Sequence, residues 1–162
     1  MLFFCHLLSG FVAGFILFLI FKDRRVILIT AFGSIIPDLI DKPLGHIVFS
    51  ETIGSGRIFF HGFFIMIILL IFGTFLYLKF KNPLFLAFAS GILVHQAGDT
   101  MWSNPQNWFW PLLGPYVTKS RYDDYFFRMV FAEISSAEEI FCLVLIITGI
   151  CVYFALKRRY NK

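Results

Sequence analysis

Residues 2–21 read LFFCHLLSGFVAGFILFLIF and contain no Asp, Glu, Lys or Arg. About 20 such residues form a helix long enough to cross the ~30 Å hydrocarbon core of a bilayer. The whole chain has this character, since 59% of its 162 residues are hydrophobic and only 15% are charged. An ordinary soluble domain has about 25% charged residues. Composition and a mean hydropathy of +0.80 exclude a disordered chain, a disulfide scaffold and an ordinary soluble domain. We therefore expect a membrane protein.

Further apolar stretches predict an all-α, polytopic membrane bundle of about five transmembrane helices in a single domain, residues 1–162. The stretches are 2–21, 26–39, 58–78, 84–101 and 137–156. The second is too short to cross the membrane unless protein shelters its polar end. We expect loops at about 42–57 and 102–136, and the tryptophans and tyrosines of the second loop suit an interfacial belt.

Basic residues predict the orientation of these helices. They follow the first, third and fifth apolar stretches, as Lys22, Arg24 and Arg25, as Lys79 and Lys81, and as Lys157, Arg158, Arg159 and Lys162. Because Lys and Arg are enriched in cytoplasmic loops, we expect a multi-pass protein of the cell membrane with its N-terminus outside and its C-terminus in the cytoplasm. The net charge of +4 is divided among these clusters and forms no basic stripe, so we predict no nucleic-acid partner.

The three cysteines, Cys5, Cys142 and Cys151, lie in apolar stretches without metal-ligand spacing. We expect them to be buried core thiols. The first apolar stretch has no basic region before it and no small-residue cleavage site, so we expect it to be retained as a helix.

Ionisable residues are scarce in the apolar stretches, and each costs roughly 2.5–3.5 kcal/mol at mid-membrane. With the predicted orientation, those within or beside the helices all lie at the outer ends. They are His6, Asp38, Asp41, His61, His95, Asp99, Glu138 and Glu139. Histidine and carboxylates are ligands of divalent metals. The Asp38/Asp41 and His95/Asp99 pairs are three and four residues apart, so each pair shares a helical face.

These residues predict a metal site. One zinc ion needs three or four protein ligands, and the first four helices offer more than that, so one or two ions are expected. The predicted ligands are His6, Asp38, His61, His95 and Asp99. Arg57, four residues before His61, offers a planar fork for a phosphate or carboxylate, and we predict catalytic roles for Arg57 and Asp41.

Each of these residues also has a purely structural explanation. His6 suits an interfacial histidine, Asp38 suits a helix end after a proline, and Asp41 suits a loop carboxylate. His61 could bond a backbone carbonyl, and Asp99 could orient a neighbouring histidine.

The remaining polar residues have structural explanations of the same kind. Glu138 and Glu139 each end a Ser-x-x-Glu capping box, and we keep them as additional ligand candidates behind that explanation. Arg57 could be an interfacial arginine that extends its charge to water. His46 is expected to be a solvated loop residue.

Four segments together resemble a known family. They are His6-Leu-Leu-Ser-Gly10, Gly33-Ser34-Ile-Ile-Pro37-Asp38-Leu-Ile-Asp41, Arg57-Ile-Phe-Phe-His61, and His95-Gln-Ala-Gly-Asp99-Thr100 with a later Trp110-Pro111. They are similar to the His-x-x-x-Gly, Gly-Ser-x-x-Pro-Asp-x-Asp, Arg-Gly-x-Thr-His, and His-x-x-x-Asp with Trp-Pro motifs of the YdjM-like family of membrane-bound, metal-dependent hydrolases. The resemblance covers about residues 1–115.

The resemblance implies a multi-pass membrane protein with metal-dependent hydrolase activity. It also implies a distant similarity to the zinc-dependent phospholipase C and nuclease group, which cleaves phosphoesters. The chain departs from the family pattern at three places. Gly56 stands where the family often has His, Gly62 stands where it often has Ser, and Asp41 follows Asp38 by three residues instead of two.

We therefore predict a membrane-bound hydrolase that uses one or two divalent ions, with zinc as the first candidate, against a phosphoester or ester of a lipid or lipid-linked substrate at the outer face. A non-enzymatic subunit, stapled by a metal or binding a partner protein, is the alternative. An ion transporter ranks last, because it would need polar residues at mid-membrane and on both sides. The sequence specifies neither the substrate nor the oligomeric state.

Overall fold

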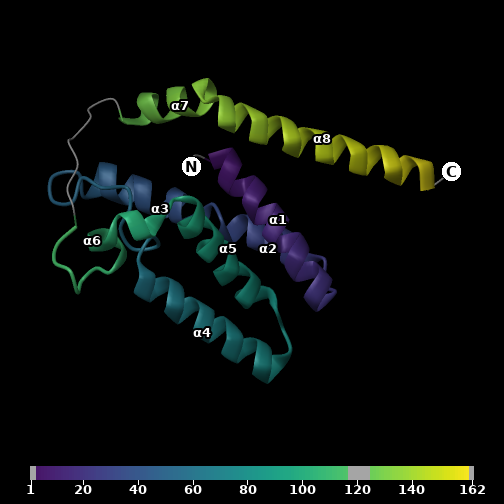
Figure 1. The fold of residues 1–162 in the computed structure, drawn as a ribbon, viewed down its shortest axis with the longest axis horizontal. Helices are drawn as coiled ribbons and strands as arrows, with labels where there is room; N and C mark the ends of the chain where they lie inside the picture. Colours follow the sequence, from purple (N-terminus) through teal and green to yellow (C-terminus); the bar gives the residue numbers. More distant parts are fainter. Residues whose placement is uncertain (1–2, 117–124, 161–162) are drawn as a thin grey trace.

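The computed structural model describes residues 3–116 and 125–160, and that part of the chain is helical without strands. The first half contains α1 (Phe3–Phe21), α2 (Arg25–Gly33), α3 (Ile36–Pro43), a π-helical turn (Leu44–Val48) and α4 (Phe63–Phe80). The second half contains α5 (Leu84–Gly98), a 3-10 turn (Met101–Ser103), α6 (Pro105–Trp108), α7 (Tyr125–Ser135) and α8 (Ala137–Tyr160). In Figure 1, α1, α2, α4 and α5 form the bundle and α8 extends away from it.

The structure divides the second predicted helix in two. α2 ends at Gly33 and α3 begins at Ile36, so the prediction of one helix over 26–39 is wrong. Pro37 lies in the first turn of α3, where a missing backbone N–H breaks no helical hydrogen bond. Asp38 also lies in that turn, where the helix dipole favours a negative charge. The break gives the polar end of this segment its own short helix.

Glycines allow α2 and α5 to pack closely. A Cβ on Gly33 would lie 2.2 Å from the backbone oxygen of Phe88, and one on Gly91 would lie 2.3 Å from that of Thr30. Neither position has room for a larger residue, because the obstacle in both cases is backbone. Small residues at such contacts are typical of helices that pack in membranes. The close approach places the C-terminal end of α2 against α5.

The third predicted helix begins later than expected. α4 starts at Phe63 instead of near Ile58, and residues 57–62 are irregular. The backbone N–H groups of Ile58 and His61 donate to the Asp41 carboxylate at 3.2 and 3.1 Å, so they need no helical partner. The fourth predicted helix, α5, ends at Gly98 and does not continue to Met101. Thr100, which follows closely, has a φ of 48°, outside the helical range.

By length and composition, α1 and α4 could each cross a membrane, whereas α5 is a shorter apolar helix. Large apolar side chains on these two helices are exposed, among them Ile16, Ile20, Ile68 and Ile71, with exposed fractions of 55–65%. Exposed apolar surface of this extent fits contact with lipid. The number of spans and their orientation stay predictions.

The segment after α5 folds back over the end of the bundle. Trp108 donates from Nε1 to Gln96 Oε1 at 2.7 Å, and Gln96 Nε2 donates to the carbonyl of Phe60 at 3.0 Å. The Trp110 ring stacks on Tyr116 with centroids 4.9 Å apart. This segment contains most of the predicted aromatic belt, whose Tyr122 lies outside the described residues.

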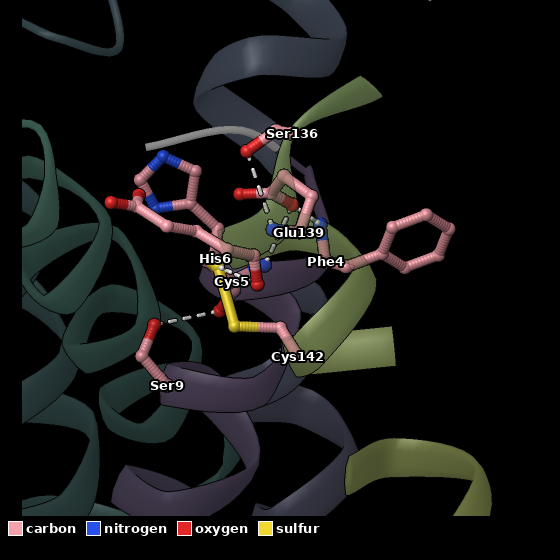
Figure 2. The surroundings of a disulfide bond; sticks show 8 residues. Phe4, Cys5, His6, Ser9, Ser136, Glu139 and Cys142 are labelled. Carbon is pink, nitrogen blue, oxygen red and sulfur yellow. Dashed lines mark hydrogen bonds between the residues drawn. A yellow bond between two sulfur atoms is a disulfide. The ribbon is translucent and has the colours of Figure 1, made fainter. Parts of the chain in front are cut away.

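A disulfide between Cys5 and Cys142 joins the start of α8 to the start of α1, with the two Cα atoms 5.3 Å apart (Figure 2). Cys151 is exposed. The expectation of three buried core thiols is therefore wrong. The separation of 137 positions between the two bonded cysteines explains the error, because spacing along the chain does not predict that the first and last helices pack together.

Candidate metal centre

The five predicted ligands come together at one end of the bundle. Ligand atoms of His6, Asp38 and His95 lie within 4.8 Å of one another, and so do those of His61, His95 and Asp99. None of the five residues is more than 8% exposed. α1, α3, α5 and the irregular segment before α4 each supply at least one of them. The structure thus brings side chains that are up to 93 residues apart into one buried cluster.

Hydrogen bonds fix the orientation of His61 and His95. His95 Nδ1 lies 2.7 Å from the carbonyl oxygen of Ser34, and His61 Nδ1 lies 2.8 Å from Asp41 Oδ2. A carbonyl or an ionised carboxylate only accepts, so each Nδ1 carries the hydrogen and donates it. In a neutral imidazole the lone pair is then on Nε2.

The two Nε2 atoms lie 3.0 Å apart. With a lone pair on each, this arrangement is repulsive unless a proton or a cation lies between them. Imidazole Nε2 atoms held in this way by a carboxylate and a backbone carbonyl are typical of metal-binding histidines.

Asp38 adds an oxygen to the same point. Its Oδ1 is buried with no hydrogen-bond partner in the described part of the chain, and lies 3.6 Å from His61 Nε2 and 3.8 Å from His95 Nε2. An unpartnered buried carboxylate oxygen is costly. Two zinc ligands at tetrahedral angles are about 3.4 Å apart. The spacing and the donor types therefore fit a divalent ion held by two imidazoles and a carboxylate.

Asp99 lies close to His61, and His6 lies against His95. Asp99 Oδ2 is 3.7 Å from His61 Nε2, and its Oδ1 is 3.2 Å from His6 Nε2. The His6 ring stacks on that of His95 with centroids 3.8 Å apart, and its buried Nδ1 has no partner among the described residues. His95 belongs to both ligand groups, and one ring nitrogen binds one ion. The two groups are therefore alternative ligand sets for one ion, or two sites of which only one uses His95.

Asp41 lies behind His61 and outside both ligand groups. Its Oδ2 accepts hydrogen bonds from the backbone N–H of Ile58, the backbone N–H of His61 and the ring Nδ1 of His61. The side chain is fully buried. This geometry suits a positioning residue that fixes the ring and tautomer of His61.

Two cations flank the cluster. Arg57 donates from Nε and Nη2 to Asp99 Oδ2 at 2.9 and 2.8 Å, and its side chain is 36% exposed. Lys42 pairs with Asp38 Oδ2 at 2.5 Å and is 22% exposed. Sequence reasoning alone misses Lys42, although its spacing of four residues from Asp38 is a signal for a helical ion pair.

Glu139 stabilises the start of α1. Its Oε2 accepts from the backbone N–H of Phe4 at 2.7 Å and of Cys5 at 3.0 Å (Figure 2). Its own N–H donates to Ser136 Oγ at 3.4 Å, which is half of the expected capping box. Glu138 is exposed, and neither glutamate belongs to the two ligand groups found among the described residues.

Two features characterise this helical protein. Two of its apolar helices are long enough to cross a membrane, and a buried His/Asp cluster lies at one end of the bundle. A model of the YdjM inner membrane protein family matches residues 1–160. The chain therefore belongs to the YdjM inner membrane protein family, which confirms the predicted family and a membrane location. The hydrolase activity and the similarity to the phospholipase C and nuclease group stay predictions. No curated protein and no solved structure matches the chain.

Proposed function

We propose that this protein is a membrane-embedded, metal-dependent hydrolase that cleaves a phosphoester or ester of a lipid at the outer membrane face, with zinc as the first candidate metal. The observation that carries the proposal is the pair of Nε2 atoms of His61 and His95, 3.0 Å apart with both Nδ1 atoms engaged. Asp38 Oδ1, which accepts no hydrogen bond from the described residues, lies beside them and offers the negative charge that a cation needs.

Each residue of the cluster has a role in this proposal. His61, His95 and Asp38 hold the ion, and Asp99 or His6 completes the ligand set. Asp41 keeps His61 oriented. When bound, a divalent ion would lower the pKa of water toward about 7 and so supply hydroxide at neutral pH. The Arg57 guanidinium, at the exposed edge, offsets negative charge that develops on the substrate.

Two independent features support an outward-facing site. Arg24 and Arg25 follow α1 at the end opposite His6, and that helix has 19 residues, or about 28 Å. Positive charge at that end favours the cytoplasmic side. The disulfide at Cys5, next to His6, favours an oxidising compartment, because disulfides are rare in the cytosol.

A lipid substrate is supported by the apolar surface near the cluster. Leu39, which follows Asp38, is 58% exposed, and Ile47, close after α3, is 70% exposed. A site whose flanking apolar side chains are exposed suits a substrate that stays in the membrane.

A metal-stapled, non-enzymatic subunit is the second candidate, and the burial of the histidines favours it. His61 and His95 are 0% exposed and His6 is 1% exposed. Structural zinc sites are closed, whereas catalytic ones keep an open position for water or substrate.

One experiment separates these functions. The full chain is purified in non-ionic detergent and tested against phosphomonoester, phosphodiester and carboxylester lipids, before and after chelation and after zinc is restored. The enzyme proposal predicts hydrolysis of at least one lipid class that is lost on chelation, restored by zinc and absent in His95→Ala. Bound metal, a melting temperature that falls on chelation and no hydrolysis of any class would instead establish the staple.

A further inference from the structure

Each carboxylate beside the Nε2 pair is bound to a cation at the edge of the cluster. Lys42 Nζ lies 2.5 Å from Asp38 Oδ2, and Arg57 Nη2 lies 2.8 Å from Asp99 Oδ2. The carboxylate side chains are only 8% and 3% exposed, whereas Lys42 and Arg57 are 22% and 36% exposed. The cations are therefore the part of the cluster that a ligand from outside reaches first.

Gly56 places the Lys42 side chain against the backbone that leads into Arg57. A Cβ on Gly56 would lie 2.7 Å from Nε2 of His46 and 3.1 Å from Cγ of Lys42. The backbone at residue 56 thus lies directly against the Lys42 side chain, and the next residue is Arg57. The glycine at this position, where the family often has a histidine, leaves room for Lys42 beside the Arg57 segment.

The charges of these four groups cancel while they form two ion pairs. Each aspartate bonds its cation through Oδ2 and directs Oδ1 to a histidine. A divalent ion bound to the histidines would also attract the carboxylates of Asp38 and Asp99. It would thereby weaken the Asp38–Lys42 and Asp99–Arg57 ion pairs. These four groups and the ion would then carry a net charge of about +2. Buried or half-buried uncompensated charge is costly.

We propose that Lys42 and Arg57 form an anion subsite that becomes available when a divalent ion occupies the cluster, and that its ligand is a phosphate group with two negative charges. The guanidinium offers a bidentate fork and the ammonium a compact charge, which together suit phosphate. This inference rests on the proposed metal centre and narrows its substrate to a phosphate monoester. A neutral carboxylester would leave the two cations without a partner.

The test is phosphate binding. The full chain in non-ionic detergent is stripped of metal or loaded with one equivalent of zinc, and the binding of radiolabelled inorganic phosphate is measured by equilibrium dialysis. We expect phosphate to bind at least ten-fold more tightly to the loaded protein. Because such coupling is reciprocal, phosphate must tighten zinc binding in wild type by the same factor.

Variants locate the subsite. Lys42→Met and Arg57→Met are each expected to weaken phosphate binding to the loaded protein about ten-fold or more, since each removes a charged hydrogen-bond donor. Lys79→Met is the matched control, because Lys79 lies in the last turn of α4, over 20 Å of helix from the cluster, and should match wild type. The zinc stoichiometry of all variants is expected to equal that of wild type.

Dihexanoyl phosphatidate as competitor distinguishes the sources of the phosphate group. Stronger competition than inorganic phosphate supports a lipid headgroup, and equal competition supports a free phosphate. If wild type binds zinc but its affinity for phosphate does not change with zinc, the anion subsite is overturned and the metal centre stands. If wild type does not bind zinc, both the anion subsite and the metal centre are overturned. If Lys42→Met does not fold, the effect of phosphate on the zinc affinity of wild type decides whether the subsite exists.

Discussion

Replacing Asp41 with asparagine tests how the site is built. Asp41 Oδ2 accepts from His61 Nδ1 at 2.8 Å and from the backbone N–H groups of His61 and Ile58 at 3.1 and 3.2 Å. Asparagine keeps the shape but removes the charge, so His61 Nδ1 loses its carboxylate acceptor. The tautomer with a hydrogen on Nε2 then becomes easier to form, and it cannot bind a metal through Nε2, the atom that faces His95. Residues that support metal ligands in this way typically contribute 10–100-fold to affinity.

We therefore expect Asp41→Asn to weaken zinc binding 10–100-fold, or by about 1.4–2.7 kcal/mol. The assay is competition with a chromogenic chelator on detergent-purified protein whose helix content is checked by circular dichroism. Asp23→Asn is the matched control, because Asp23 pairs with Arg25 beyond the other end of α1. The control should stay within about two-fold of wild type. Equal zinc affinity for wild type and folded Asp41→Asn would refute the role of Asp41.

Three further changes test the fold around the cluster. In intact cells, we expect Cys5 and Cys142 to react with a thiol reagent only after reduction; free thiols without reductant would contradict the disulfide. Glu139→Ala should lower the melting temperature by a few degrees, since loss of a helix cap costs about 0.5–2 kcal/mol, and an unchanged value would contradict the cap. Gly33→Ala should reduce both thermal stability and zinc binding, because its Cβ would meet backbone, whereas Gly149→Ala should lose neither, since nothing lies within 4 Å.

The sequence predicts the helical class and the membership of the cluster because polar residues are scarce, whereas it misses the break after Gly33 and the helix α7 within 102–136. In a chain with 15% charged residues, each ionisable residue in an apolar stretch needs an explanation. The metal-ligand types and the i to i+4 spacing of His95 and Asp99 then indicate one shared face. The structure brings these side chains together as that reasoning predicts.

The errors have tertiary causes. The Asp41 carboxylate takes the N–H groups that would have begun α4 at Ile58, and it is 17 residues away in the chain. The break after Gly33 depends on contact with α5, which local propensity does not contain. Lys42 looks like a loop lysine until its pairing with Asp38 is seen. Such contacts are properties of the packed chain and not of a local segment.

The divalent metal content of the protein, measured after equilibration with zinc and removal of the excess, decides whether the His/Asp cluster is a metal centre. We expect at least one equivalent in wild type and a large loss in His61→Ala and in His95→Ala. His46→Ala, a histidine outside both ligand groups, should retain the wild-type content. Wild-type protein without zinc, or equal zinc in all four proteins, would contradict the metal centre.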